Sequence, residues 1–187
     1  MAMAETVGTD IAKLRELTLY ICRKSEGDDS FGSVKLNKLL FLSDFTFYTA
    51  KGKAITGQEY QKLESGPAPR IMPALLREMD RDGDLKIADR QYCGRPQKRP
   101  FAFREPDLSV FTGEEIAVVD AIVEGCRGMH GRDIRLQSHR FVGWQLAQIG
   151  ETIPYSSTLL EKRELTPQEL KWAEELDFTG VSELLAS

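Results

Sequence analysis

The first apolar pattern of the chain has helical spacing. Four residues, three or four positions apart, would lie on one face: Ile11, Leu14, Leu17 and Ile21. Asp10 precedes them and can accept a hydrogen bond from the first turn, and a polar stretch begins after Ser25. The pattern therefore predicts an amphipathic helix that starts after Asp10 and ends near Ser25.

A second helix is predicted from Ser33, which can act as its N-cap, to Gly52, which lies just beyond its end. Its apolar residues point in several directions around the helix axis: Leu36, Leu39, Leu40, Phe41, Leu42, Phe45 and Phe47. A helix that is apolar on most sides packs in the interior, so we expect this one at the centre of the fold. The segment 53–70 mixes glycine, proline and isolated apolar residues, which predicts extended and irregular backbone.

The middle of the chain predicts a helix followed by a β-hairpin. Proline is tolerated in a first helical turn, so the helix is expected from about Pro73 to the stretch Asp82-Gly83-Asp84. Alternating apolar residues then predict two antiparallel strands over about 85–104, with a turn around Gly94 to Gln97. Five cations with no acid between them make this hairpin basic: Arg90, Arg95, Lys98, Arg99 and Arg104.

Capping signals mark the helices of the last third. Thr112 and Glu115 form a capping box ahead of an apolar helical pattern, and Gly125 can end that helix. Two short helices are expected to follow, over 133–139 and 143–148.

A second capping box, with a proline at the first helical position, is formed by Thr166 and Glu169. Together these elements predict an α+β fold, mainly α, with a helical core and a small antiparallel β-hairpin. We expect residues 1–160 to form one domain and residues 161–187 to form an acidic C-terminal helix and tail. That tail carries seven acids against three bases, which accounts for the net charge of -4.

Composition places the chain among folded, cytoplasmic proteins. Its 187 residues, 41% of them hydrophobic, suffice for a core without disulfides. Cys22, Cys93 and Cys126 are far apart and form no CxxC pair, which favours a reducing compartment. No apolar run is long enough to span a bilayer and the N-terminus has no export pattern, so we expect no membrane association.

The stretch SHRFVGWQLAQIGETIPY raises the question of catalysis. Ser138 and His139 lie beside each other with Asp133 nearby, which would provide the residue types of a hydrolytic triad. However, neighbours in sequence rarely face one another on a helix, and no G-x-S-x-G turn is present. A histidine packed and hydrogen-bonded beside Trp144 is the favoured interpretation.

Metal and cofactor sites have little support in the sequence. Cys126, His130 and His139 could contribute metal ligands, but no fourth ligand has a recognisable spacing. No G-x-G-x-x-G or Walker-type loop occurs either. We therefore expect no metal, no cofactor and no enzymatic activity.

The basic hairpin leaves DNA binding as an alternative. A helix followed by a charged hairpin is the layout of a winged helix, in which Arg95, Lys98 and Arg99 would contact phosphate. The supposed recognition helix and its end carry four acids, however: Glu78, Asp80, Asp82 and Asp84. Those acids would repel a polyanion. A solvated hairpin or an arm for an acidic protein partner are competing interpretations.

Two blocks of the sequence resemble the SocA-like antitoxins, also called the Panacea domain family. The first block is KLNKLLFLSDFTFYTAKGKAITGQEYQKLESGP, in which K-L-x-K-L-L-aromatic opens a helix and Gly-Pro closes an extended segment. The second has the pattern SH…GW..A..GE.IPY. Together they cover roughly residues 10–160. Ser65 stands where members often carry an aromatic residue, and Val142 where they often carry proline.

The resemblance implies the antitoxin half of a bacterial or phage toxin–antitoxin pair. Members bind and neutralise a cognate toxin, usually encoded beside them, and one branch delivers the toxin to a cellular protease. We expect the helix 34–49, packed on the segment 139–155, to present the contact face. Its proposed residues are Lys35, Lys38 and Tyr60, expected to be exposed or half-exposed, with His139, Trp144 and Tyr155.

Overall fold

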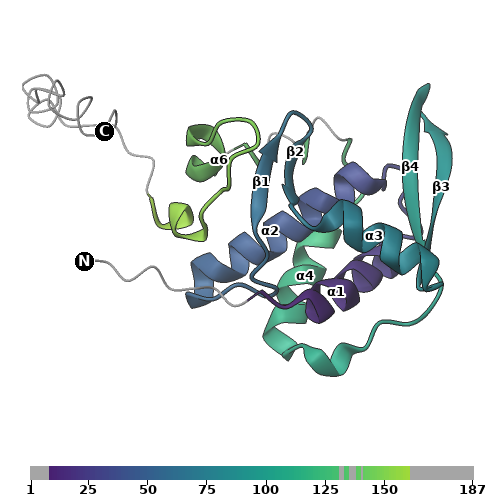
Figure 1. Cartoon of the computed structure of the whole chain (residues 1–187), viewed down its shortest axis with the longest axis horizontal. Helices are drawn as coiled ribbons and strands as arrows, with labels where there is room; N and C mark the ends of the chain where they lie inside the picture. The colour runs from purple at the N-terminus through teal and green to yellow at the C-terminus, as the bar shows by residue number, and fades with distance from the viewer. Residues whose placement is uncertain (1–8, 131–132, 135–137, 140, 161–187) are drawn as a thin grey trace, which may run out of the picture.

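Helix α2 (Ser33–Lys51) lies at the centre of the computed structural model, which describes residues 9–130, 133–134, 138–139 and 141–160 (Figure 1). Helices α1 (Ile11–Lys24) and α4 (Gly113–Gly125) pack against it. The described residues otherwise form helix α3, two antiparallel hairpins, the short helix α6 and two 3-10 turns. The predicted α+β fold, mainly α, is confirmed.

The position of α2 follows from its sequence. Leu36, Leu39, Leu40, Phe41 and Phe45 are all completely buried, so the prediction of a central helix is confirmed. Burying an apolar side chain of this size stabilises the fold by about 1.5–3 kcal/mol.

Both ends of α2 were assigned from capping signals. The helix ends at Gly52, whose left-handed φ of 71° suits glycine, as predicted. The N-cap is Gly32, and the expectation that Ser33 would cap the helix was wrong. Ser33 is the first helical residue, and its hydroxyl donates a hydrogen bond to the carbonyl of Lys98 instead.

Helices α1 and α4 begin as predicted. The Asp10 carboxylate accepts a hydrogen bond from the Lys13 amide at 2.8 Å. Thr112 and Glu115 form both hydrogen bonds of a capping box. Glu115 also accepts a 2.8 Å hydrogen bond from the Lys13 side chain, so the start of α4 is tied to α1.

A hairpin that the sequence did not predict lies beside α2. Strands β1 (Tyr60–Leu63) and β2 (Gly66–Pro69) are antiparallel, with Tyr60 opposite Pro69. The segment after α6 adds to its free edge, where the amide of Ile153 donates to the Tyr60 carbonyl. Tertiary hydrogen bonds thus impose strand structure on a Gly- and Pro-rich segment that was expected to be irregular.

Helix α3 (Met72–Arg81) and the long hairpin follow the predicted order. Strands β3 (Leu85–Tyr92) and β4 (Arg95–Ala102) pair in register along their full length. The turn consists of Cys93 and Gly94, both with positive φ, and is shorter than the expected turn from Gly94 to Gln97.

Ion pairs fix α1 against the far ends of α3 and β4. Arg15 binds Asp84 at 2.6 Å and also contacts Glu78 and Asp82 at the end of α3. Arg104, just after β4, binds Glu16 of α1 at 2.6 Å and Asp84 at 2.7 Å. Several acids of the supposed recognition helix therefore have partners within the fold.

After the 3-10 turn η1 (Leu108–Val110) and α4, the chain reaches α6 (Val142–Leu146) and η2 (Tyr155–Leu159). Gly143 of α6 lies against η2 so closely that an added Cβ would overlap the Ser157 side chain. Of the short helix expected over 133–139, Asp133, Ile134 and Ser138 are helical and residues 135–137 lie outside the described residues. The capping box at Thr166 lies wholly outside them. No helix in the described part is long and apolar enough to cross a membrane.

Candidate functional site: a groove at the start of helix α2

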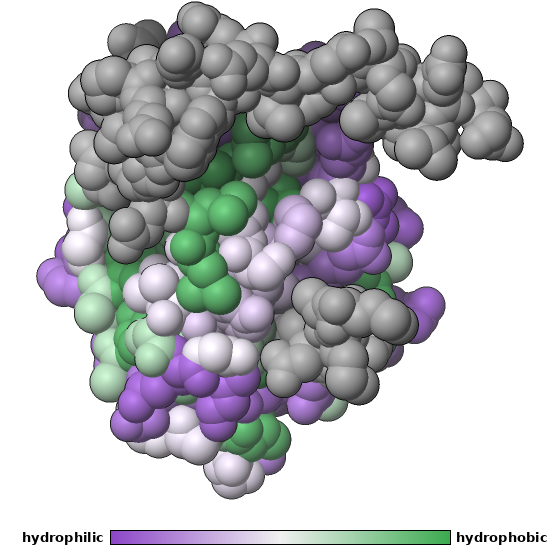
Figure 2. Space-filling view, turned by 90° about the vertical axis from the view of Figure 1, so that its left-hand side faces the viewer, coloured by the Kyte–Doolittle hydropathy of each residue, from purple (hydrophilic) through white to green (hydrophobic). Residues whose placement is uncertain are grey.

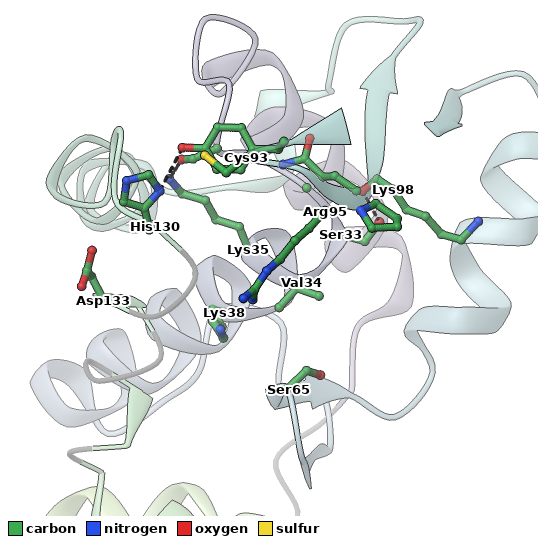
Figure 3. Close-up of a pocket in the computed structure, with 15 residues that line it drawn as sticks. Ser33, Val34, Lys35, Lys38, Ser65, Cys93, Arg95, Lys98, His130 and Asp133 are labelled. Atoms are coloured by element: carbon green, nitrogen blue, oxygen red, sulfur yellow. Dashed lines mark hydrogen bonds between the residues drawn. The ribbon is translucent and has the colours of Figure 1, made fainter. Parts of the chain in front are cut away.

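A cavity of about 990 Å³ opens beside the first turn of α2 (Figure 3). Its walls come from four places that are distant in sequence: the start of α2 with the loop before it, the β1–β2 turn at Ser65, the tip of the β3–β4 hairpin and the residues His130 and Asp133. We call it the α2 groove. The lining residues used below are Val34, Lys35, Lys38, Tyr92, Arg95 and His130.

Lys35 forms the floor of the groove and is only 4% exposed. Its ammonium group donates to the Asp28 carboxylate at 2.6 Å, to the Ser30 hydroxyl at 2.8 Å and to the Cys126 carbonyl at 2.7 Å. The expectation that Lys35 would be exposed was therefore wrong. A lysine can be buried here because an acid and several oxygens surround its charge.

Asp28 is the acid that this lysine requires. Burial alone would raise the pKa of Asp28, but hydrogen bonds from Lys35 and Ser30 outweigh that effect and hold its pKa below the ordinary value. Asp28 was not among the candidate site residues. The signal that could have found it is the acidic loop EGDD immediately before a helix with lysines on otherwise apolar faces.

Lys38, one turn further along α2, is only 2% exposed, which again contradicts the expected exposure. Its aliphatic chain runs across Gly66 of β2, where an added Cβ would lie 2.8 Å from Lys38 Cε. Gly66 also has a φ of 115°, which side-chain-bearing residues rarely adopt. The lysine of the K-L-x-K motif and the glycine of the Gly-Pro motif are thus packed together.

The hairpin supplies the rim of the groove. Arg95 is exposed and extends from the turn into the cavity, in the direction of Lys38 (Figure 3). Lys98 also lines the cavity and pairs with Asp89 at 3.1 Å, with both side chains largely exposed.

Arg99 is not a surface residue, contrary to its assignment as a nucleic-acid contact. It is 6% exposed and donates to the backbone carbonyls of Ser25, Glu26 and Asp28. These bonds join β4 to the loop before α2. Of the three proposed phosphate contacts, only Arg95 and Lys98 are exposed.

His130 and Tyr92 form the wall opposite α2. The Tyr92 hydroxyl lies 3.0 Å from His130 Nδ1, and the two rings are tilted with centroids 5.8 Å apart. Asp133 is an exposed acid at the same edge of the groove. From the sequence, His130 was a candidate for a metal ligand only, and no metal-binding group of acids, histidines or cysteines occurs among the described residues.

Tyr60 and Tyr155 lie away from the groove, in the interior beside the second half of α2. Tyr60 is 1% exposed, so its expected exposure was wrong, and its hydroxyl donates to Asp44 at 2.8 Å. Tyr155 stacks on Phe45 and donates to the Gln58 carbonyl. Burial raises the pKa of both tyrosines, so both hydroxyls serve as hydrogen-bond donors.

His139 and Trp144 form a third, separate cluster. Their rings stack with centroids 3.4 Å apart, and the Lys62 ammonium lies 4.1 Å from the centroid of the Trp144 ring. The predicted packing of the histidine beside the tryptophan is confirmed. Ser138 is fully buried, so its hydroxyl is out of reach of a substrate in solution.

Apolar side chains are exposed at the end of the molecule formed by α6 and η2 (Figure 2). They are Leu146, Ile149, Leu159 and Leu160, each more than half exposed. This surface differs in character from the α2 groove, whose open side carries cations.

The six residues proposed for partner binding therefore fall into three places. Two lie in the groove, two in the interior and two in the stacked cluster. The fold brings the first pair together with Arg95, a residue that had been assigned to a different function.

Residues 36–145 match the family model described as antitoxin SocA-like, Panacea domain. The match covers more than half of the chain, so the chain belongs to the SocA-like antitoxin family, as its sequence motifs indicated. No curated protein and no solved structure matches it.

Proposed function

We propose that this protein neutralises a cognate toxin by direct protein binding. Membership of the SocA-like antitoxin family is the observation that carries the proposal. Membership suggests a regulatory role without catalysis. In this proposal the toxin is the product of the adjacent gene, and the partner is a protein.

The α2 groove and the separate stacked cluster of His139 and Trp144 are the two proposed contact regions. Lys35 and Lys38 contribute through the floor of the groove, and Trp144 and His139 present a partly exposed aromatic pair. Tyr60 and Tyr155 act indirectly, by holding the segment that carries this pair. A few anchors of this kind, at about 2 kcal/mol or more each, supply most of the affinity of a typical interface.

DNA binding receives less support from the structure. Arg99 is used inside the fold and Arg104 binds two acids, which removes two of the five hairpin cations from any phosphate contact. Binding to duplex DNA depends on several cations following the phosphate backbone. We therefore keep protein binding as the proposed function.

The proposal is tested by expressing the adjacent reading frame from an inducible promoter, with and without this protein. We expect the neighbour to stop growth, and this protein to restore growth and to co-purify with it. A harmless neighbour, or rescue without any complex between the two proteins, would contradict direct neutralisation.

The same strains separate occlusion from delivery to a protease. Under occlusion, the toxin accumulates in a complex while growth is normal. Under delivery, the toxin is depleted in the presence of this protein and reappears when the responsible protease is removed. Toxin half-life after translation arrest is the measurement that distinguishes the two.

A further inference from the structure

We propose that the α2 groove is an anion site that takes an acidic, extended segment of the protein partner. The inference rests on the proposed function in one respect, because the segment is assigned to the neutralised toxin. The argument comes from the charges, shape and edges of the groove.

The cations at the groove come from two separate elements. Lys38 of α2 is only 2% exposed, whereas Arg95 is exposed and enters the cavity from the start of β4 (Figure 3). Arg95 makes no hydrogen bond or ion pair with the part of the chain that the structure describes. Its five donors are therefore available to a carboxylate, which a guanidinium can bind in a bidentate manner.

Few acids at the groove could neutralise Arg95. The Asp28 carboxylate is already bound by Lys35 and Ser30. Asp89 pairs with Lys98, but both side chains are largely exposed, so this pair contributes little and can exchange partners. Among the described lining residues, Asp133 is the one exposed acid, and it forms no ion pair with Arg95. The charge of Arg95 is thus available to an anion that enters the groove.

The first turn of α2 adds to this charge. Ser33 and Val34 line the groove, and the N-cap Gly32 offers no side-chain acceptor to the first amides of the helix. The N-terminal end of a helix carries a partial positive charge, which favours a nearby anion. This contribution reinforces the charge of Arg95.

The size and walls of the groove favour a peptide over a nucleic acid. A volume of about 990 Å³ matches sites for small ligands or short segments, whereas a duplex is too wide to enter. Val34 is 48% exposed at one wall, and Tyr92 forms another, so the carbon atoms of acidic side chains find apolar contacts. Arg99 is buried, so the exposed cations do not continue along the hairpin as a track for phosphates.

The hairpin edge indicates how the segment would bind. Pro96 and Pro100 alternate with Lys98 on β4, and the Lys98 carbonyl on this edge is already bound by Ser33. Proline has no amide hydrogen, so this edge cannot pair with an added strand. Recognition in the groove therefore depends on side-chain charges, with Arg95 as the main contact.

The test uses the full chain and a fluorescein-labelled oligoglutamate peptide, with binding followed by fluorescence anisotropy at low salt. We expect Arg95→Glu to weaken binding by about tenfold or more, because an attraction becomes a repulsion. The matched control is Arg90→Glu, an exposed cation on the same hairpin that does not line the groove. We expect this control to bind within about twofold of the unchanged protein.

Three results would overturn the proposal. The first is that oligoglutamate does not bind, and the second is that both variants lose binding equally. The third is that the peptide does not bind, while a labelled oligonucleotide or inorganic phosphate binds in a manner that depends on Arg95.

A fourth result concerns the chain's own acidic residues 161–187. If the peptide binds only after those acids are replaced by glutamine, the occupant is this segment and not a partner.

Growth rescue separates this inference from the proposed function. If the protein rescues growth but neither rescue nor peptide binding responds to Arg95→Glu, the groove assignment fails and the antitoxin function remains. If peptide binding depends on Arg95 but no neighbour is toxic, the anion site remains and its assignment to a toxin fails.

Discussion

The two halves of helix α2 each bury a charged residue, and they stabilise it in different ways. At the end near the groove, a buried cation, Lys35, is neutralised by Asp28. In the second half of the helix a buried acid, Asp44, has no cationic partner among the described residues and is held by neutral donors, among them the Thr56 amide and the Tyr60 hydroxyl. One end lines the α2 groove and the other is closed by aromatic rings.

The closed end is built from rings that contact one another edge to face or stacked. Phe45 is completely buried and lies within 6 Å, centroid to centroid, of Phe41, Tyr60, Phe141 and Tyr155. Such pairs add about 0.5–1.5 kcal/mol to the effect of burial. This half of the helix therefore contributes mainly to stability, whereas the first half lines the α2 groove.

The largest effect should come from removing the central ring. Phe45→Ala is expected to lower the free energy of unfolding by about 3–5 kcal/mol, because it leaves a cavity among rigid neighbours. Val34→Ala, on the same helix but 48% exposed, should change it by less than about 0.5 kcal/mol. Urea denaturation followed by circular dichroism measures both, and similar losses would remove the contrast between the two ends.

A smaller effect is expected at the buried acid. Asp44→Ala leaves the Thr56 amide and the Tyr60 hydroxyl without their acceptor, and should lower the free energy of unfolding by about 2–3 kcal/mol. Asp44→Asn keeps an acceptor for the amide and should cost less.

This acid should also give a pH dependence. Burial raises the pKa of Asp44, so its contribution to stability is complete below the ordinary carboxyl pKa and is lost as pH rises through the folded value. The free energy of unfolding of the Asp44→Asn variant, measured between pH 4 and 8, should not show this decline. A decline that persists in the variant would assign it to another group.

The smallest effect on stability is expected at the floor of the groove, and its pH dependence runs in the opposite direction to that of Asp44. The pKa of Asp28 is held below its ordinary value, so its contribution is present above the ordinary carboxyl pKa and is lost as the pH falls through the folded value. Asp28→Asn should cost about 2 kcal/mol near pH 7 and progressively less below pH 4. If the free energies of unfolding of the variant and of the unchanged protein differ by the same amount at every pH, the prediction is refuted.

Much of the fold could be predicted because its signals are local. The capping box at Thr112 and Glu115, the cap at Asp10 and the turn glycine Gly52 act within a few residues, and all three were correct. Hairpin β1–β2 was missed because its pairing depends on α2 and on the distant segment around Ile153. A strand whose pairing depends on distant segments has no local sequence pattern that predicts it.

The site was harder to predict because it depends on burial. The sequence indicated that α2 is buried on most sides, and this should have implied that Lys35 and Lys38 are buried as well. Their partners come from other segments, such as Asp28 for Lys35 and Gly66 for the chain of Lys38. Likewise, nothing in the basic run around Arg99 distinguished the buried arginine from its exposed neighbours.

The packing of Lys38 on Gly66 constrains how sequences of this family can diverge. A side chain at position 66 would need a backbone φ of 115°, which residues other than glycine rarely adopt, and it would push aside the end of the Lys38 chain. The backbone strain would remain even with a shorter residue at position 38. We therefore expect relatives that keep this hairpin to keep glycine at position 66, while position 38 can vary more freely.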